Sequence, residues 1–361
     1  MRRFRALGAL AVMVAWLAAG PATAAPAPTA ADSIDALIEA EMARHAIPGL
    51  VLAVVRAGET TKLAAYGQAN VELGVPTSAA TLFPLASTGK SISATAILLL
   101  VQDGAIGLDQ PIAELLVGLP DPWGGVTVRQ LLTHTSGLPD VALEPGRPEL
   151  IADSWAEALP RLAAMPLAFP PGERWAYNQT NYVLLGQVIE RVSGMPFEEF
   201  IRERILDPAG MDATVYGDFL DVVPGRATSY EADDGLLRHR SSLVFPRYVR
   251  MAAGLNSNAP DMVRWIRALT RGGLLREDLR REMWTAVELA DGSTFRLDGA
   301  TVGYGMGWVV DDRPGRRAVG HSGGNSSAFR YFLDDDVAIV VLHNGRASPD
   351  ALIDAVADIV L

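Results

Sequence analysis

The sequence of 361 residues lacks cysteine altogether, which excludes disulfide bonds and a lipid-anchored thiol. Aromatic residues are scarce at 7%, and charged residues make up only 20%, whereas 49% of the residues are hydrophobic. That balance excludes intrinsic disorder, which requires low hydrophobicity and a high density of charge. A chain of this length can bury a large apolar core, so we expect one large domain or two that need no covalent cross-links.

Residues 1–24 have the layout of a secretory signal peptide. Three arginines come first, an almost unbroken apolar run follows over residues 6–19, and Ala22-Thr23-Ala24 offers a small-residue cleavage site. The apolar run is shorter than the about 20 residues that span a bilayer. We expect cleavage after Ala24 and a mature chain of residues 25–361 in the periplasm or outside the cell, with no membrane insertion. The alternative is a hydrophobic N-terminal helix.

The charge balance narrows the class of partner. The whole chain has a formal charge of −11, and residues 1–24 hold three arginines and no acid, so the remainder carries −14. An acidic body of this kind argues against binding to nucleic acid or to an anionic membrane. The expected partner is therefore a small molecule or a peptide that serves as substrate.

Strand patterns lie at both ends of the chain, and the middle is mostly helical. The predicted strands cover residues 50–55, 60–66, 306–310, 318–320, 328–333 and 337–342. The predicted helices begin at residues 32 and 348 near the ends and cover 91–102, 127–133, 180–193 and 259–271 in the middle.

This order predicts an α/β (α+β) fold in which both chain ends form one antiparallel sheet flanked by terminal helices. The sheet subdomain should comprise about residues 32–80 and 290–361. A large, mostly helical insertion should comprise about residues 81–289. We expect a functional site where the two parts meet.

The clearest chemical signal is Ser87-Thr88-Gly89-Lys90, directly before the apolar helix. Ser87 and Lys90 are three residues apart and share a helix face. A lysine at the base of an apolar helix loses hydration, which lowers its pKa and makes it a candidate base for the serine. Taken alone, the four-residue pattern is more often a capping serine and a solvated lysine than a catalytic pair.

Two further signals follow. Tyr177-Asn178-Gln179 lies on a loop beside a helix start, where the local field could remove the tyrosine proton; an ordinary half-buried tyrosine is the alternative. The segment 320–324 reads Gly-His-Ser-Gly-Gly and matches G-x-S-x-G, the nucleophile elbow of the α/β-hydrolases. That elbow must lead from a strand into a helix, and here the chain returns to strand. A small-residue strand edge facing a ligand fits better.

The sequence predicts neither a cofactor nor a metal. Gly89-Lys90-Ser91 resembles the end of a phosphate-binding loop, but Pro84 stands where that loop needs glycine. No zinc-ligand spacing is present, and the alternate glycines at 303–307 have no helix after them, as a dinucleotide fingerprint would require.

With these three motifs in this order, the chain resembles the class C β-lactamase-like serine hydrolases. That family includes class C β-lactamases, D-alanyl-D-alanine carboxypeptidases, D-aminopeptidases and esterases. The resemblance runs from about Ile34 to about Asn344. Framework stretches also match at residues 81–83, 131–138, 171–172 and 181–186.

The resemblance implies the following roles. Ser87 is similar to the acylated nucleophile, Lys90 to its proton acceptor, and Tyr177 to the tyrosine that passes protons to the leaving group. The framework residue His134 is expected to be a structural hydrogen-bonder.

The third motif would complete the site. His321-Ser322-Gly323 matches the family's Lys/His-Thr/Ser-Gly strand. The backbone N–H groups of Ser87 and Gly324 would form the oxyanion hole. Ser322 would bind a carboxylate or carbonyl of the substrate.

Two residues depart from the β-lactamase pattern. Gln179 stands where those enzymes usually have asparagine, and His321 where they have lysine. A histidine is mostly neutral at pH 7, so it anchors a β-lactam carboxylate poorly. The expected function is a secreted serine hydrolase acting on esters or amides. The alternatives are a β-lactamase, a D-Ala-D-Ala carboxypeptidase or D-aminopeptidase, and a penicillin-binding sensor that acylates without turnover.

Overall fold

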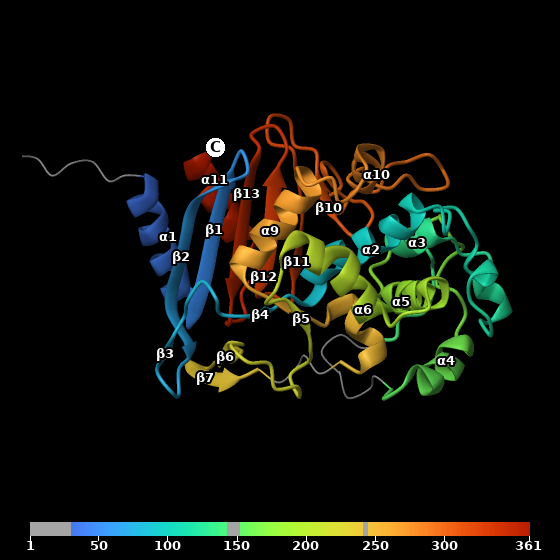
Figure 1. Cartoon of the computed structure of the whole chain (residues 1–361), viewed down its shortest axis with the longest axis horizontal. Coiled ribbons are helices and arrows are strands. Elements are labelled where there is room, and N and C mark those ends of the chain that lie inside the picture. Colours follow the sequence, from blue (N-terminus) through green and yellow to red (C-terminus); the bar gives the residue numbers. More distant parts are fainter. Residues whose placement is uncertain (1–29, 143–151, 241–244) are drawn as a thin grey trace, which may run out of the picture.

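The computed structural model describes residues 30–142, 152–240 and 245–361, so the predicted signal peptide lies outside the described residues. A sheet occupies one half of the molecule and helices gather in the other half (Figure 1). In the part of the chain that the structure describes, no helix is both long enough and apolar enough to cross a membrane.

One antiparallel sheet takes its strands from both chain ends, as predicted. β1 (Gly49–Arg56) pairs with β13 (Val337–His343), with Leu50 opposite His343. The spatial order of its eight strands is β3 (Val75–Pro76), β2 (Glu59–Asn70), β1, β13, β12 (Ser327–Phe332), β11 (Ala318–Gly323), β10 (Val309–Asp311) and β9 (Val302–Tyr304).

Three strands differ in length from the predicted ones, and the first is β2, which continues to Asn70 beyond the predicted end at residue 66. β10 is shorter than the predicted strand 306–310, because Gly307 has a φ of +76°, which a pleated strand does not accommodate. β11 is longer than the predicted strand 318–320, and its additional residues are His321-Ser322-Gly323. The third sequence motif therefore lies within the sheet.

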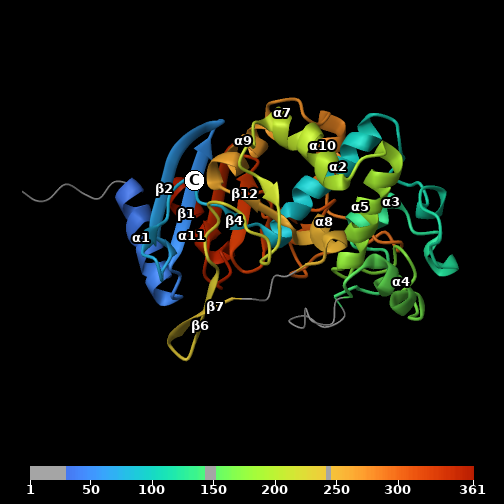
Figure 2. The same ribbon diagram turned by 60° about the horizontal axis from the view of Figure 1, so that its bottom comes forward.

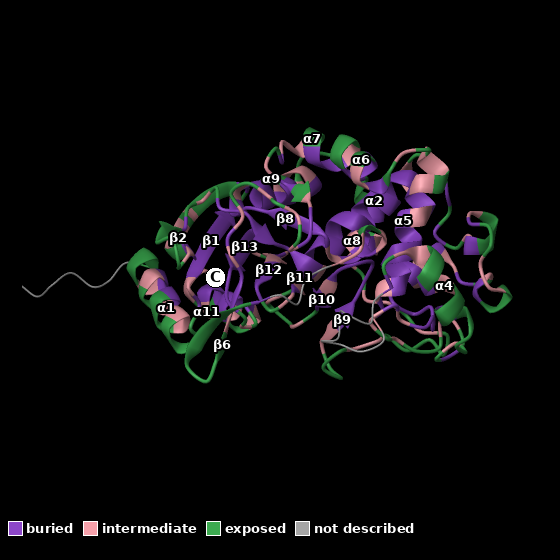
Figure 3. Ribbon diagram, turned by 90° about the horizontal axis from the view of Figure 1, so that it is seen from below, coloured by how far each residue is buried: buried purple, intermediate pink, exposed green. Residues whose placement is uncertain are grey.

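Alternate residues of the central strands face two separate cores. Leu50 and Leu52 of β1 pack with α1 (Ala30–Arg44) and α11 (Asp350–Val360) on one face. Val51 and Ala53 pack on the other face, which α9 (Ala259–Thr270) covers. Because both faces are covered, β1 and β13 are buried along almost their whole length (Figure 3).

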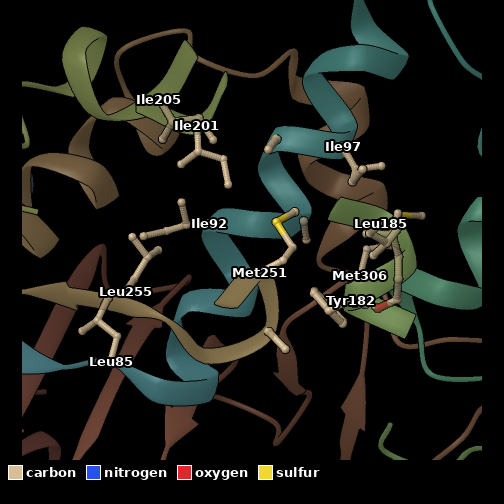
Figure 4. Packing of buried hydrophobic residues seen from close by; sticks show 14 of the residues in the cluster. Leu85, Ile92, Ile97, Tyr182, Leu185, Ile201, Ile205, Met251, Leu255 and Met306 are labelled. Atoms are coloured by element: carbon tan, nitrogen blue, oxygen red, sulfur yellow. Dashed lines mark hydrogen bonds between the residues drawn. The ribbon is translucent and has the colours of Figure 1, made fainter. Parts of the chain in front are cut away.

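The helical half is organised around α2 (Lys90–Gln102). Eleven of its thirteen residues are buried, and Ile92 and Ile97 point to opposite sides into the packing of neighbouring helices (Figure 4). The other helical segments are α3 (Val128–Leu132), α4 (Trp155–Ala163), α5 (Gln179–Ser193), α6 (Phe197–Ile201), the π segment Arg202–Leu206, α7 (Asp207–Ala209), α8 (Arg250–Ala253), α10 (Glu277–Met283) and short 3-10 turns at Ala86–Gly89, Ile112–Glu114, Asp121–Trp123 and Arg247–Val249.

The middle of the chain also contains strands that the sequence did not predict. β4 (Phe83–Pro84), β8 (Leu255–Ser257) and β5 (Val215–Tyr216) form a small sheet. β6 (Tyr230–Asp233) and β7 (Leu236–His239) form a hairpin that projects from the body (Figure 2). Strands of two to four residues carry too little periodicity to be recognised from the sequence. The small sheet fixes the chain that enters the first sequence motif.

Candidate active site

Ser87 lies in the 3-10 turn Ala86–Gly89, one turn before α2. Ala86 has a φ of 45°, a left-handed conformation that costs free energy for a residue with a side chain. Contacts to β12 hold the turn in place: the Thr88 hydroxyl lies 2.9 Å from the Ser327 hydroxyl, and Ser327 donates to the Leu85 carbonyl at 2.6 Å. The turn therefore presents Ser87 from a rigid support.

Lys90 is fully buried, with 0% of its side chain exposed. Its Nζ lies 3.3 Å from Ser87 Oγ, 2.8 Å from Gln179 Oε1 and 2.9 Å from the Ala252 carbonyl oxygen. Burial lowers the Lys90 pKa to about 7, and the charge of Asp140 opposes that fall. The direction agrees with the sequence prediction, and a neutral Lys90 can accept the Ser87 proton.

Tyr177 contributes the third side chain beside Ser87. Its ring centroid lies 4.8 Å from Lys90 Nζ, and its hydroxyl oxygen is buried without a hydrogen bond in the described residues. Burial raises the Tyr177 pKa; the neighbouring Ser87 hydroxyl opposes this rise, although its geometry falls short of a hydrogen bond. The interpretation that the local field removes the Tyr177 proton is therefore wrong, and Tyr177 is a neutral phenol.

His134 packs against the loop that carries Tyr177. Its ring centroid lies 4.4 Å from that of Tyr177, and its Nδ1 accepts from the backbone N–H of Asn178 at 3.2 Å. The Asn181 side chain lies 3.1 Å from the same nitrogen. Burial lowers the His134 pKa well below its usual value, so the ring is neutral. A neutral acceptor with these contacts is the structural hydrogen-bonder that the sequence predicted.

His321 faces the same cluster from β11. Its Nδ1 lies 2.7 Å from the Ser322 carbonyl oxygen and must donate to it, so its Nε2 accepts from the Tyr304 hydroxyl at 3.0 Å. Burial lowers the His321 pKa to about 3. The ring is thus a neutral, doubly engaged group and supplies no cation where β-lactamases have lysine.

The structure does not bring Ser322 to the other predicted residues. Successive residues of β11 point to opposite faces, and Val319 and His321 face the helical half. Ser322 points to the face of the terminal helices, where its hydroxyl donates to Asp350 at the start of α11 and accepts from Arg330 at 3.2 Å. In this position Ser322 cannot bind a substrate beside Ser87.

The end of β11 does lie against the nucleophile turn. A Cβ on Gly323 would fall 2.8 Å from the Ser87 backbone nitrogen and 2.1 Å from the Leu85 carbonyl oxygen, so only glycine fits there. A Cβ on Gly324 would fall 3.1 Å from Ala86 Cβ. Gly324 therefore lies beside the turn that carries Ser87.

Sequence reasoning missed three groups that shape this site. Tyr304 holds the His321 ring, the Ala252 carbonyl accepts from Lys90, and Arg240 donates to the Gly324 carbonyl at 2.7 Å. Arg240 also lines a cavity of about 500 Å³ whose other walls come from residues 219–223, 226–229 and 239. Each of these contacts joins segments far apart in the sequence, so no local pattern marked them.

A fourth missed residue, Asp140, did have a local signal. It follows the matched framework stretch 131–138 after a single proline, as a lone acid beside apolar residues. Its Oδ1 accepts from the backbone N–H of Gln179 at 3.0 Å. The acid therefore reaches the start of α5, next to the glutamine that contacts Lys90.

The Beta-lactamase family profile matches residues 34–360. Penicillin-binding protein 4* of Bacillus subtilis (strain 168) is 30% identical over 341 residues, which cover 86% of this chain and 71% of that protein. Esterase EstB of Burkholderia gladioli is 31% identical over 356 residues, covering 86% of this chain and 88% of EstB.

A solved structure shows the same fold. The D-amino acid amidase from Ochrobactrum anthropi SV3, complexed with L-phenylalanine amide, superposes with a TM-score of 0.79 at 26% identity, over 92% of this chain and 99% of the amidase. The fold and these similarities agree with the arrangement of Ser87 and Lys90 described above. The chain belongs to the Beta-lactamase family of serine hydrolases.

Proposed function

We propose that this chain is an exported hydrolase of the class C β-lactamase-like group, which cleaves ester or amide bonds through an acyl-enzyme on Ser87 and needs no cofactor. The observation that carries the proposal is the fully buried Lys90, whose Nζ lies 3.3 Å from Ser87 Oγ and whose pKa is about 7. A lysine in this state is a base matched to neutral pH.

Acylation follows from this geometry. Neutral Lys90 takes the proton of Ser87, and Ser87 Oγ attacks the carbonyl carbon of the substrate. Negative charge develops on the carbonyl oxygen, and the N–H groups of Ser87 and Gly324 would stabilise it. Tyr177 then delivers its phenol proton to the leaving oxygen or nitrogen and recovers a proton from Lys90, which completes the acyl-enzyme.

Deacylation uses the same groups in reverse. Once the leaving group departs, a water molecule takes its place and gives a proton through Tyr177 to Lys90. The hydroxide equivalent attacks the acyl carbon, and Ser87 leaves with a proton returned from Lys90. Every proton thus moves between groups within one buried cluster.

Esters and peptide-like amides fit this site better than β-lactams. A β-lactam needs a cation for its carboxylate, but His321 is neutral and both of its ring nitrogens are engaged. Gln179, the other departure from the β-lactamase pattern, directs its Oε1 to Lys90 at 2.8 Å and not to open space.

The neutral His321 predicts that esters are hydrolysed more efficiently than cephalosporins. The kcat/KM of a short-chain 4-nitrophenyl ester should exceed that of a chromogenic cephalosporin by at least tenfold, because the anchoring cation is missing. Steady-state kinetics with one purified preparation would measure both. A cephalosporin kcat/KM above about 10⁶ M⁻¹s⁻¹, well within the range of efficient enzymes, would refute the preference and favour the β-lactamase alternative.

Labelling with a fluorophosphonate tests the proposed function directly. An activated serine attacks this reagent irreversibly, so mass spectrometry should place the adduct on Ser87, and Ser87→Ala should not be labelled. Ser322→Ala is the matched control, because that hydroxyl lies on the opposite face of β11. An adduct on Ser322 in the wild-type protein would contradict the proposal.

The sensor alternative differs from an enzyme in its time course. A sensor would release one equivalent of nitrophenol in a burst and then stop, with the acyl group still on Ser87. Continued release after the first equivalent would show deacylation. The buried phenol of Tyr177 beside Lys90 favours turnover.

A further inference from the structure

Arg250 begins the short helix that contacts the proposed base. It is the first residue of α8, and the Ala252 carbonyl of that helix accepts from Lys90 Nζ at 2.9 Å. The Arg250 Nη2 lies 2.9 Å from Asp218 Oδ2 and 2.8 Å from Asp221 Oδ2. The Arg250 side chain is 21% exposed and that of Asp218 is 7% exposed. Solvent therefore screens this contact less than a surface ion pair, and charge joins α8 to the loop that holds both acids.

The loop that holds these two acids is fixed by its own hydrogen bonds. Asp221 Oδ2 accepts from the backbone N–H of Asp218 at 2.9 Å, and Asp218 Oδ1 accepts from that of Leu220 at 2.8 Å. Arg226 donates to the carbonyl oxygens of Asp218 at 2.6 Å and of Asp221 at 2.8 Å. The loop can therefore serve as a support for the Arg250 guanidinium.

The helix α8 (Arg250–Ala253) has too little structure of its own to fix the Ala252 carbonyl. Its four residues complete about one turn, and a single turn is not stable in isolation. The two acids hold its first residue, and Met251 lies in the packing around α2 (Figure 4). The Met251 carbonyl also accepts from Ser93 Oγ at 2.7 Å. The contacts of Arg250 and Met251 therefore set where the Ala252 carbonyl lies against α2.

The Ala252 carbonyl helps to orient Lys90. A neutral lysine has two N–H donors and one lone pair on Nζ. Gln179 Oε1 and the Ala252 carbonyl oxygen can only accept, so they take the two N–H groups at 2.8 and 2.9 Å. The lone pair then faces the third contact, Ser87 Oγ at 3.3 Å. A displacement of Ala252 would release one N–H group and allow the lone pair to turn away from Ser87.

We propose that Arg250 is a positioning residue for Lys90. It holds α8 against the loop with its two acids, so that the Ala252 carbonyl orients Lys90 toward Ser87. This inference rests on the proposed acyl-enzyme function, in which Arg250 takes no chemical step. The competing role for Arg250 is general stability, without an effect on Lys90 in the molecules that fold.

Arg250→Met tests the proposal, because it keeps a long side chain and removes the contact with both acids. The burst of nitrophenol from a short-chain 4-nitrophenyl ester measures acylation as a function of pH. Labelling to completion with a fluorophosphonate counts the folded active sites, so that each rate is expressed per site. A loss of general stability lowers the number of sites and leaves the rate per site unchanged.

Above pH 7, we expect Arg250→Met to acylate about 10- to 100-fold more slowly per site, the effect of a misplaced reacting group. The Ala252 carbonyl stabilises the ammonium form of Lys90, so its loss lowers the Lys90 pKa further. The fall in rate at acid pH should therefore begin about one pH unit lower than in the wild-type enzyme. If Arg250 acted on Lys90 through its own positive charge, its removal would raise that pKa and move the fall to higher pH.

The other groups around Lys90 do not obscure this readout. The titratable groups that face it are Tyr177, Tyr182, His134, His321 and Asp140. Burial raises the pKa of both tyrosines and lowers that of both histidines, to about 3 for His321, so none of these four titrates near pH 7. Asp140 contacts the start of α5 and not α8, so a difference between the two enzymes reports Lys90.

Two further variants serve as controls. Arg250→Lys keeps a positive charge for the two acids and should stay within about fivefold of wild type per site. Arg264→Met removes another arginine that is paired with a buried acid, because Arg264 Nη1 lies 2.6 Å from Asp261 Oδ1 on α9. It should leave the rate per site within about twofold of wild type and the pH profile unchanged.

Asp221→Asn decides the question if Arg250→Met does not fold. Asp221 is 43% exposed, so this substitution weakens the contact with Arg250 and disturbs little packing. We expect a loss of about two- to tenfold per site, with the pH profile displaced in the same direction.

Each other outcome overturns the inference. A wild-type rate and pH profile per site in Arg250→Met, or in Asp221→Asn where Arg250→Met does not fold, would refute the positioning role and leave the acyl-enzyme function standing. So would a shift of the fall to higher pH, or an equal loss in Arg264→Met. The absence of a fluorophosphonate adduct on Ser87 in the wild-type protein would refute the proposed function and this inference with it.

Discussion

Replacing Lys90 with arginine should abolish acylation of Ser87 almost as completely as replacing it with alanine. Arginine keeps the positive charge and similar size, but its guanidinium cannot give up a proton near neutral pH. We expect both variants to lose roughly 10³–10⁴-fold in kcat/KM for a 4-nitrophenyl ester, the upper part of the range for a lost general base. Stopped-flow measurement of the nitrophenol burst reports acylation alone.

The pH profile provides an independent readout of the same base. The Lys90 pKa is lowered to about 7, so the neutral form that accepts a proton predominates above that pH. Acylation by the wild-type enzyme should therefore fall about tenfold per pH unit below pH 7 and level off above it. The residual activity of Lys90→Ala should not show this fall below pH 7.

A folded control is needed because Lys90 is fully buried. Lys90→Met fills the same space without a charge, so it should fold and be as inactive as the alanine variant. Near wild-type turnover by a folded Lys90→Arg enzyme would exclude Lys90 as the base. Lys90 would then act only through its charge, and Tyr177 would be the remaining candidate.

Tyr177→Phe should leave the fold intact and slow turnover by roughly 10²–10⁴-fold, as expected for a lost general acid–base. The ring packs against His134, and the hydroxyl makes no hydrogen bond in the described residues, so its removal costs little stability. The thermal unfolding midpoint and the rates of burst and steady state would separate stability, acylation and deacylation. The steady-state rate should fall at least as much as the burst.

Tyr304→Phe provides the matched comparison for Tyr177. It removes the same atom from a second tyrosine of the cluster, but that hydroxyl is committed to His321 Nε2 at 3.0 Å. We expect less than a tenfold loss of activity. If Tyr304→Phe were the more damaging change, or if Tyr177→Phe stayed within threefold of wild type, Tyr177 would not be the proton shuttle.

The sequence by itself determined the parts that depend on local patterns. The apolar run after Lys90 appears as the buried helix α2, and the alternating or continuous apolar segments at both ends appear as β1, β2, β12 and β13. Periodicity of this kind reflects which side of an element meets the core, so it can be recognised without knowing the partner. The order of the motifs was enough to indicate the family.

Only those site residues that belong to the same short motif could be paired from the sequence. Ser87 and Lys90 are three residues apart, and the structure places their side chains in contact. The fate of the Tyr177 proton could not be deduced, because its pKa depends on burial by segments elsewhere in the chain. The short strands β4, β5 and β8, which hold the nucleophile turn, were also missed because two or three residues carry no usable period.

Tertiary structure alone decided which face of β11 each motif residue occupies. His321 and Ser322 are adjacent in the sequence, yet one faces Tyr304 and the other Asp350 across the sheet. The tertiary structure also brings Lys90 to Ala252 and Asp140 to Gln179. The two residues of each pair are dozens of positions apart in the sequence. A local pattern records residue type and spacing, whereas hydration, proton affinity and substrate access depend on the neighbours that folding brings from other segments.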